Sequence, residues 1–507
     1  MNDARHASGL VIALLLCAAP LAAESENDWF VPLGPPPKAS PERISGGEGV
    51  PPLPLPATPL RRSERKRQPS APPLIGKLVW GEAASYRYDT GATADISDWN
   101  LCPGDVQAIV GKAQRVLGTA YGYEQVSLAT FDDDPTRLPL LFVSGVRTIR
   151  FSQDQVARLR AYVQRGGMVV FDSVAGSPYF TDAARAFADA AFPDAPLRTV
   201  PEDHPLYHML TDVTTVGFGR NAPGDRPHME AVYVGSRCGV LISPYGLGTG
   251  WDDHGVASIE QAVFYDVDAA SRLGLNLVAY AVGYAAVGQA EGRPELFGAL
   301  DERRPANEFV FAQVRHGGHW DAHPGAAVAL LGRVAADTSV ATSRKRVAVV
   351  PGRDDLEPYP VLFMTGLDDP RFDDKARAAL RAFIVRGGTL IVDNALGLGG
   401  FDAAFRRELA SILPGSALQP IPPDHPLFSA AVPVREAIYT PLVTHEHPDL
   451  TAPRLEGLAV EGELRVIYSP YDLHAGWAGV ECPMSRGFSP ETASALGLDL
   501  IVYALTH

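Results

Sequence analysis

Polar side chains that could do chemistry follow short apolar runs at corresponding places in the two halves of the chain. Asp172 and Ser173 end one such run, and Asp393 and Asn394 end its counterpart. A carboxylate in this position can accept a proton or hold a ligand hydroxyl. It can equally cap the backbone of the next segment with its side-chain oxygens. Ser173 is a weak candidate nucleophile, because its surroundings are not GxSxG and Asn394 replaces it in the other half.

Two histidines, His204 and His425, lie in Asp-His-Pro loops. An aspartate before a histidine can fix the tautomer of a general base. The same sequence is also an ordinary turn former, and its presence in both halves suits a constraint of the fold equally well. Both histidines are therefore candidates for a ligand site and for a structural role.

The sharpest polar cluster of the first half is the run Trp251-Asp252-Asp253-His254, which follows Tyr245. A carboxylate beside an imidazole can orient and charge it, which gives a ligand clamp or an acid/base pair. The other half keeps both aromatic side chains but replaces the two acids and the histidine with Ala, Gly and Val. We therefore predict that the first half holds the working site. The aromatic side chains suit either sugar platforms or anchors in the core.

Metal ligands and thiols give weaker signals. His316, His319 and His323 form a cluster, and imidazoles suit zinc, copper or nickel, but an intervening Gly-Gly pair disfavours a helical ligand face. Cys102 precedes a proline at a predicted helix start, where the helix dipole could lower the pKa of its thiol, yet His323 replaces it in the other half. The cysteines lack CxxC spacing, which favours structural thiols or one bridge. We predict no metal site, no cofactor and no catalytic residue.

The two halves are copies of one domain. Residues 165–167 (Arg-Gly-Gly) match residues 386–388, and the Asp-His-Pro loops match each other, both at an offset of 221 positions (388 minus 167, 425 minus 204). Later matches drift only slightly: the Ser-Pro-Tyr at residues 243–245 recurs at residues 469–471, an offset of 226. Such a sustained offset indicates an internal duplication.

Each copy alternates apolar runs with helical patterns, which is typical of a parallel sheet covered by helices. The predicted strands are residues 78–80, 140–143 and 168–171 in the first copy and 309–311, 361–364 and 389–392 in the second. Residues 153–163 and 374–385 are predicted helices, each closed by a Gly pair that supplies a left-handed cap. Pro103 and Pro324 suit the first position of an earlier helix. The sequence therefore predicts two tandem α/β domains with parallel central sheets.

With its order of strand, Gly-containing turn, amphipathic helix, Gly-Gly, strand and Asp, the chain resembles the bacterial family domain of unknown function 4159, over residues 76–284 and 309–507. The resemblance implies a flavodoxin-like sheet similar to class I glutamine amidotransferase domains. It also implies a bacterial envelope protein, of a kind often encoded near MoxR-type ATPases. Amidotransferases of this class carry a cysteine on the sharp turn after a central strand. The comparable turns here, residues 171–176 and 392–397, contain no cysteine, so no thioester mechanism is carried over.

The region ahead of the repeats predicts export. Residues 1–23 combine Arg5, an apolar run and small residues ending at Ala23, which is typical of a signal peptide. An uncleaved anchor that gives peripheral membrane contact through the N-terminus stays open. Residues 24–74 contain 13 prolines and predict an extended spacer or a disordered tail. The repeats then span residues 75–297 and 307–507, joined by a linker at 298–306, in a periplasmic or envelope-associated protein.

The formal charge of -15 disfavours nucleic acid as a partner, because binding to phosphates needs a basic surface. Our leading hypothesis is a non-catalytic binding or scaffolding protein whose partner is an envelope protein or a small ligand. One alternative is a hydrolase that uses Asp172 and His204, with Asp252 or His254 as a further group. Another is a carbohydrate-binding module that uses Trp251 and Trp477.

Overall fold

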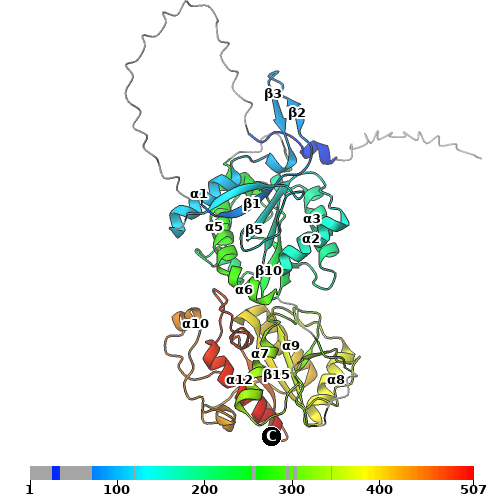
Figure 1. The fold of residues 1–507 in the computed structure, drawn as a ribbon, viewed down its shortest axis with the longest axis vertical. Coiled ribbons are helices and arrows are strands. Elements are labelled where there is room, and N and C mark those ends of the chain that lie inside the picture. Colours follow the sequence, from blue (N-terminus) through cyan, green and yellow to red (C-terminus); the bar gives the residue numbers. More distant parts are fainter. Residues whose placement is uncertain are drawn as a thin grey trace, which may run out of the picture.

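The two repeats stack end to end, and the C-terminus lies at the far end of the second repeat (Figure 1). The computed structural model describes residues 25–34, 71–118, 120–253, 259–292, 297–300, 305, 307–343 and 345–507. The predicted leader, most of the proline-rich segment and His254 lie outside the described residues.

The first repeat is built on a seven-stranded sheet in the order β4-β1-β5-β6-β10-β9-β7. Its strands are β1 (Pro73–Leu78), β4 (Gly122–Val126), β5 (Leu140–Gly145), β6 (Met168–Ser173), β7 (Arg198–Thr199), β9 (Glu230–Val234) and β10 (Arg237–Ser243). The five neighbouring strands β4, β1, β5, β6 and β10 run parallel, whereas β9 pairs antiparallel with β10 and with β7. The parallel core has the strand order of flavodoxin-like folds.

Helices cover both faces of this sheet. One layer contains α1 (Asp105–Leu117), the short α4 (Gly248–Trp251) and α5 (Val267–Gly283), and the other contains α2 (Gln153–Gln164) and α3 (Pro178–Ala191) (Figure 1). Alternate residues of a strand serve the two layers: Phe142 of β5 packs in the core with α1 and α5, whereas Leu141 packs with α2 and α3. Coverage on both faces explains why the central strands are continuous apolar runs. The helix α6 (Ala285–Glu291) follows α5.

The second repeat has the same architecture, with a sheet in the order β13-β12-β14-β15-β18-β17-β16. Its strands are β12 (Ala312–Val314), β13 (Val347–Val349), β14 (Val361–Gly366), β15 (Thr389–Asn394), β16 (Gln419–Pro420), β17 (Glu456–Val460) and β18 (Glu463–Ser469). Its helices are α7 (Ala326–Asp337), α8 (Asp374–Val385), α9 (Gly399–Ile412), α10 (Pro441–Glu446), α11 (His474–Ala478) and α12 (Pro490–Thr506). The predicted class of two tandem flavodoxin-like α/β domains is confirmed.

Smaller elements decorate the first repeat. A hairpin of β2 (Ala84–Arg87) and β3 (Thr93–Ile96) projects from the end that faces away from the second repeat (Figure 1). Two short strands, β8 (Phe218–Arg220) and β11 (Phe264–Tyr265), pair with each other. The described N-terminal piece contains the 3-10 helix η1 (Glu26–Trp29).

Most predicted elements match the structure, but the first strands are shifted. The predicted helices 153–163 and 374–385 are α2 and α8, and Gly166 and Gly387 after them have positive φ angles of 111° and 98°. The strand β1 ends at Leu78, whereas Trp80 lies in the turn before Gly81, whose φ is 73°. Similarly, residues 309–311 precede β12. The two prolines lie ahead of the N-caps Gly104 and Gly325 and are not the first helical residues.

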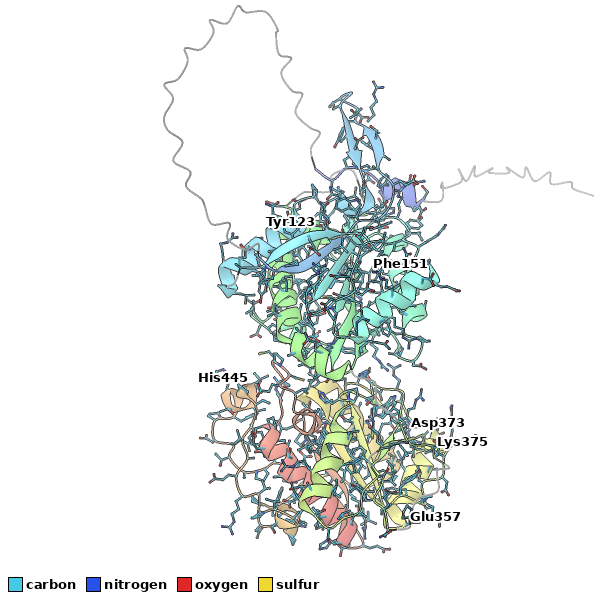
Figure 2. All side chains as sticks on the ribbon, in the orientation of Figure 1. Tyr123, Phe151, Glu357, Asp373, Lys375 and His445 are labelled. Carbon is cyan, nitrogen blue, oxygen red and sulfur yellow. The ribbon has the colours of Figure 1, made fainter. Side chains whose placement is uncertain are left out.

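The repeats are joined head to tail. Arg198 of β7 donates to the Gly317 carbonyl at 2.6 Å and pairs with Asp368, and the Nε2 of His319 lies 2.6 Å from the Gly235 carbonyl. The side chains of the two repeats meet across this junction (Figure 2). Because Gly317, His319 and Asp368 follow β12 and β14, the first repeat covers the carboxyl edge of the second sheet.

In the described residues, no single helix is long and apolar enough to cross a membrane. The helices α5 and α6 meet the length and composition test only as a pair, across a bend of 46°. The side chains of Leu273 and Leu277 in α5 are buried in the core of the first repeat.

Candidate functional site

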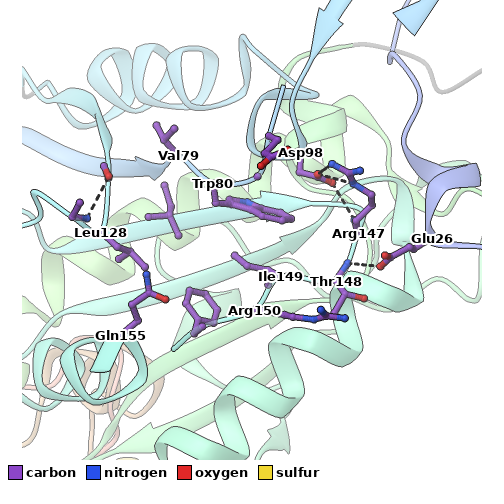
Figure 3. Close-up of a pocket in the computed structure, with 16 residues that line it drawn as sticks. Glu26, Val79, Trp80, Asp98, Leu128, Arg147, Thr148, Ile149, Arg150 and Gln155 are labelled. Atoms are coloured by element: carbon purple, nitrogen blue, oxygen red, sulfur yellow. Dashed lines mark hydrogen bonds and ion pairs between the residues drawn. The ribbon is translucent and has the colours of Figure 1, made fainter. Parts of the chain in front are cut away.

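The first sheet changes its direction of winding at β1. The chain passes from β1 to β4 on one side and then returns to β5 on the other side of β1. Open parallel sheets bind ligands beyond the carboxyl ends of their strands at such a point. A cavity of about 790 Å³ lies there, bordered by the segments after β1, β4 and β5 (Figure 3). We call it the switch-point cleft. It is lined by Glu26, residues 78–82, Asp98, residues 127–129, residues 147–151 and Gln155.

Arg147 is held at the rim of the cleft by a buried carboxylate. Its Nε and Nη2 donate to Asp98 Oδ2 at 2.9 and 2.6 Å, and its backbone N–H donates to Asp98 Oδ1 at 3.2 Å. The guanidinium also lies over the ring of Phe30, 3.7 Å from the ring centre. One carboxylate oxygen, Asp98 Oδ2, and an aromatic face together fix the position of this cation.

A carboxylate of the chain itself occupies the next position along the rim. The Oε2 of Glu26 accepts a hydrogen bond of 3.0 Å from the backbone N–H of Thr148 (Figure 3). This hydrogen bond, the Thr148 side chain and the charges of Arg147 and Arg150 lower the pKa of Glu26. The rim of the cleft therefore favours a negatively charged group.

Arg150 is the second cation of this rim. Its side chain is exposed and forms neither an ion pair nor a hydrogen bond with another residue in the described part of the chain. Arg147, in contrast, already has its charge balanced by Asp98. Arg150 is thus the cation that remains available to an anionic ligand.

The wall of the cleft is aromatic and apolar. The Trp80 indole N–H donates to the Ser144 carbonyl at 2.8 Å, and the ring stacks on Phe180 with centroids 5.8 Å apart. Ile149 and Phe151 add apolar surface (Figures 2 and 3). The lining residues include no cysteine or histidine, so this cleft lacks the usual pairing of a nucleophile with an imidazole base. The cleft thus places the cationic side chains of Arg147 and Arg150 beside an aromatic and apolar wall.

The equivalent place in the second repeat is closed. Arg198 and the turn at Gly235, both from the first repeat, occupy the region beyond β12 and β14. The open cleft is thus in the first repeat, but the residues that line it are not those that the sequence singled out.

The structure buries Asp172 in a polar cluster below α4. Its Oδ1 and Oδ2 accept hydrogen bonds from the backbone N–H groups of Leu247 and Gly248 at 2.7 and 2.8 Å. Burial raises the pKa of Asp172 to about 7, although these hydrogen bonds oppose the shift. Ser173 donates to the Ser177 carbonyl at 2.6 Å. Both side chains hold local backbone, and neither lines the switch-point cleft.

Two residues that the sequence analysis missed complete this cluster. The Lys77 ammonium donates to Asp105 Oδ1 and to the Cys102 carbonyl, both at 2.7 Å. Burial raises the pKa of Asp105 to about 6 against the influence of Lys77. Burial, followed by the charge of Asp105, also raises the pKa of the Cys102 thiol, opposite to the effect expected at a helix start.

The pKa of Asp172 provides a test of this arrangement. The folded protein keeps the Asp172 proton up to a pH of about 7, whereas the unfolded chain releases it near pH 4. This group therefore lowers the free energy of unfolding as the pH rises through that window, by at most about 1.4 kcal/mol per pH unit. Asp172→Asn removes the dependence. Urea unfolding measures the free energy of unfolding of both proteins. The value for wild type minus that for the variant should fall from pH 4.5 to 7.5, and a difference that stays constant would contradict the buried placement of Asp172.

In the second repeat Asp393 has the same role as Asp172. Its Oδ1 accepts from the Leu473 N–H at 2.7 Å, and its Oδ2 lies 3.0 Å from Nδ1 of His474, which stands where the first repeat has Gly248. Burial, followed by the charge of Asp472, raises the pKa of Asp393. Asn394 donates to the Pro470 carbonyl at 3.3 Å.

The turns that follow β6 and β15 keep a strained backbone without a nucleophile. Ala175 and Leu396 have positive φ angles of 60° and 57°, although neither is a glycine. Both side chains are fully buried at 0% exposure. These are the turns at which the resemblance places the amidotransferase cysteine, and here the residue with a positive φ is apolar in each repeat.

His204 and His425 cap short 3-10 helices, η4 (Pro205–Tyr207) and η6 (Pro426–Ser429). Each Nδ1 accepts the backbone N–H two residues ahead, at 3.1 Å in both loops. Burial lowers the pKa of His204 to about 3 and also lowers that of His425. Asp203 does not orient His204, because its Oδ2 accepts the Gly399 N–H at 2.6 Å across the junction.

The cluster around Trp251 divides among separate roles. Trp251 is 3% exposed and donates its indole N–H to the Ala270 carbonyl at 2.7 Å, and Trp477 is 4% exposed with the same type of hydrogen bond. Neither ring offers an open face to a sugar. Asp252 Oδ2 accepts the Gly104 N–H at 3.1 Å, and Asp253 is exposed with a φ of 55°. Tyr245 packs edge-on against Phe218.

The predicted histidine cluster disperses. The Nε2 of His316 lies 2.8 Å from the Thr365 carbonyl, and burial lowers the pKa of His316 to about 4. His319 contacts Gly235, and His323 points to other partners. Among the residues that the structure describes, no group of three potential ligands is arranged to hold a metal ion. Cys102, Cys238 and Cys482 are all free and buried.

His323 instead bridges two buried carboxylates from different repeats. Its Nδ1 lies 2.8 Å from Glu291 Oε1 of α6, and its Nε2 lies 2.9 Å from Asp472 Oδ2. Burial disfavours the charged ring, but Asp472 and Glu291 hold the pKa of His323 well above its usual value. Burial would raise the pKa of Asp472, but His323 and backbone N–H groups lower it overall. The triad is an ionic contact that ties the two repeats together.

Comparison with known families agrees with the duplicated architecture. The profile of Domain of unknown function (DUF4159) matches residues 90–282 and 310–505. The chain belongs to the DUF4159 family. Each match covers one repeat, so the protein contains two DUF4159 domains in tandem. Comparison with curated proteins gave no match. Of the two DUF4159 domains, the first keeps an open switch-point cleft and the second has it covered by its neighbour.

Proposed function

We propose that this tandem DUF4159 protein is an exported, non-catalytic binding protein, which takes a partner or ligand bearing a carboxylate in the switch-point cleft of the first repeat. One contrast carries the proposal. The turns at which a nucleophile would stand hold the buried side chains of Ala175 and Leu396, whereas the cleft presents Arg150 without a partner in the described residues.

The polar residues singled out by the sequence support binding more than hydrolysis. Asp172 is engaged by two backbone N–H groups, and His204 by one, and they share no partner. An acid/base pair needs both groups within reach of one reacting atom. The proposal of export rests on the sequence of residues 1–74, which has the pattern of a leader followed by a proline-rich spacer.

The binding function predicts that reversing the charge of Arg150 abolishes capture of the partner. Full-length protein, as wild type and as Arg150→Glu, would be used to capture components of envelope extracts, with identification by mass spectrometry. We expect any specific component to be reduced at least tenfold with Arg150→Glu, because the cation that meets the ligand carboxylate becomes an anion.

Arg381→Glu is the matched control. Arg381 is an exposed arginine of α8 in the second repeat, so the change of net charge is the same at a distant surface. We expect this variant to capture the same components as wild type. Equal capture by all three proteins would exclude the cleft as the binding site.

A further inference from the structure

A short N-terminal segment, residues 25–34, lies on the carboxyl edge of the first sheet beside the cleft. It is anchored at two places of different chemistry. Glu26 places its carboxylate on the Thr148 N–H, and Trp29 is buried at 3% exposure. In Figure 1 this segment, drawn in dark blue, lies next to the β2–β3 hairpin. We call it the N-terminal strap.

Trp29 packs over the turn after β6, which is the turn at which class I amidotransferases carry their cysteine. Trp29 belongs to the apolar cluster that contains Cys102, Val146, Val174 and Ala175. Phe30, the next residue, supplies the ring beneath the Arg147 guanidinium. The strap thus binds to the first repeat by a carboxylate followed three residues later by two adjacent aromatic side chains.

The strap has its own local structure. The backbone N–H of Ser25 donates to Asp28 Oδ2 at 2.8 Å, and this bond closes the 3-10 turn that contains Glu26 and Trp29. The turn sets the spacing between the two anchors in the bound strap. Internal hydrogen bonds of this kind reduce the entropic cost of ordering a short peptide when it binds.

One contact of the strap is imperfect. The Trp29 indole nitrogen is buried and has no hydrogen-bond partner among the described residues. A buried donor without an acceptor weakens binding, because the group loses its hydrogen bond to water. The strap also leaves most of the cleft empty, since the cavity of about 790 Å³ is present with Glu26 at its border. A partner segment that also fills the cleft, and whose own indole N–H has a hydrogen-bond acceptor, would bind more tightly than the strap.

Building on the binding function proposed above, we propose that the first repeat recognises acidic-aromatic peptide segments of a partner protein, with a Glu three residues before a Trp-Phe pair. The strap holds this site in cis until such a segment displaces it. The strap therefore shows the chemistry of the partner: a carboxylate for Thr148 and the two arginines, and aromatic rings for Arg147 and the apolar socket.

The test uses full-length protein in which the strap is released by Glu26→Ala, Trp29→Ala and Phe30→Ala together. A fluorescein-labelled peptide with the sequence of residues 25–34 is titrated, and binding is followed by fluorescence anisotropy. We expect saturable binding to the released variant at least tenfold tighter than to wild type, where the tethered strap competes at a high effective concentration. A peptide that lacks the Glu and Trp should not bind, and adding Arg150→Glu to the released variant should weaken binding.

A second measurement covers the case in which the released variant does not fold. A site for a specific protease is placed between residues 35 and 70 of the wild-type chain, and cleavage leaves the strap held only by its contacts. We expect labelled peptide to replace the cleaved strap. A strap that never exchanges, or a cleaved protein that unfolds, would show that the segment is an integral part of the fold and would overturn the proposal.

The outcomes separate this inference from the proposed function. If the peptide fails to bind a folded, released variant while Arg150→Glu still abolishes capture from extracts, the recognised class is wrong and the binding function stands. If the peptide binds but capture ignores Arg150, the proposed function fails. A wild-type protein that is dimeric and becomes monomeric on release of the strap would place the strap on a second copy and contradict occupation in cis.

Discussion

Replacing His323 with alanine is expected to lower the free energy of unfolding by about 3–5 kcal/mol, the usual effect of removing one partner from a buried ionic contact. The change leaves the carboxylates of Glu291 and Asp472 facing each other without a cation, and both side chains are at most 3% exposed. Because Glu291 belongs to the first repeat and Asp472 to the second, the loss weakens the junction. Urea unfolding followed by circular dichroism measures the change, and the two repeats should then unfold in separate steps.

The pH dependence gives this prediction a sign. The raised pKa of His323 means that its contribution is complete below about pH 6.5 and is lost only as the pH rises through the higher pKa of the folded state. The lowered pKa of Asp472 means that its contribution is present above about pH 4 and is lost as the pH falls through the folded value. In His323→Ala, Asp472 loses the cation that lowers its pKa, so its carboxyl takes up a proton more readily at low pH and loses its unpaired charge. The deficit of the variant should therefore be smaller at pH 4.5 than at pH 7.

His319→Ala is the matched control, because His319 lies in the same loop and crosses the same junction. Its imidazole makes a single hydrogen bond, to the Gly235 carbonyl, and its backbone N–H bond to Asp368 is kept in the variant. We expect this variant to lose only about 1 kcal/mol. Similar losses for the two variants, or a deficit of His323→Ala that does not change with pH, would mean that the triad contributes no more than an ordinary hydrogen bond.

Duplication is the reason why the fold could be predicted from the sequence. A position that is apolar in both copies is constrained twice, so the pattern from β5 through α2 to β6 was located almost to the residue. Trp80 was misplaced because an aromatic residue after two apolar residues resembles a strand. The positive φ of Gly81 turns the chain there, and the Trp80 indole N–H donates to the Ser144 carbonyl near the end of β5.

The switch-point cleft could not be predicted from local pattern. Its position depends on the order of strands in space, and the sequence shows only the order along the chain. Arg147 and Arg150 look like ordinary surface loop residues in the sequence, and Glu26 falls in a segment predicted to be part of the spacer. One signal does point to the polar cluster: Lys77 interrupts the apolar run of β1. A charged side chain in a buried strand needs a buried partner, which here is Asp105.

The ionic triad escaped prediction for a related reason. His323 attracted attention as one of three nearby histidines, but its partners come from α6 of the first repeat and from the loop before α11. Only the head-to-tail docking of the repeats brings these groups together. The same docking covers the switch point of the second repeat, whereas that of the first repeat borders an open cleft.

Replacing Lys77 with glutamine is expected to destabilise the first repeat by about 3–5 kcal/mol at neutral pH. The ammonium is the cation that faces Asp105, and the two side chains are 4% and 0% exposed. Without it, the charged form of Asp105 is disfavoured further, so its pKa should rise above the value of about 6 in the wild type. The deficit should accordingly grow as the pH rises from 5 to 8. Thermal and urea unfolding measure it, with Lys345→Gln, a change at an exposed lysine, as the control for charge.

The second repeat supplies the variant that decides whether the lost charge pairing is the cause. Register with β5 and β14 places Gln313 where the first repeat has Lys77, and the constant offset places Ala326 where it has Asp105. The same fold is therefore stable with Gln and Ala at these two places. Adding Asp105→Ala to Lys77→Gln removes the unpaired carboxylate, and most of the lost stability should return, to within about 1–2 kcal/mol of wild type. The remaining loss comes from two broken hydrogen bonds, from Lys77 to the Cys102 carbonyl and from the Val106 N–H to Asp105. The double variant contains no unpaired carboxylate at position 105. If it is nevertheless as unstable as Lys77→Gln alone, loss of charge pairing is not the cause, and Lys77 stabilises the repeat through packing.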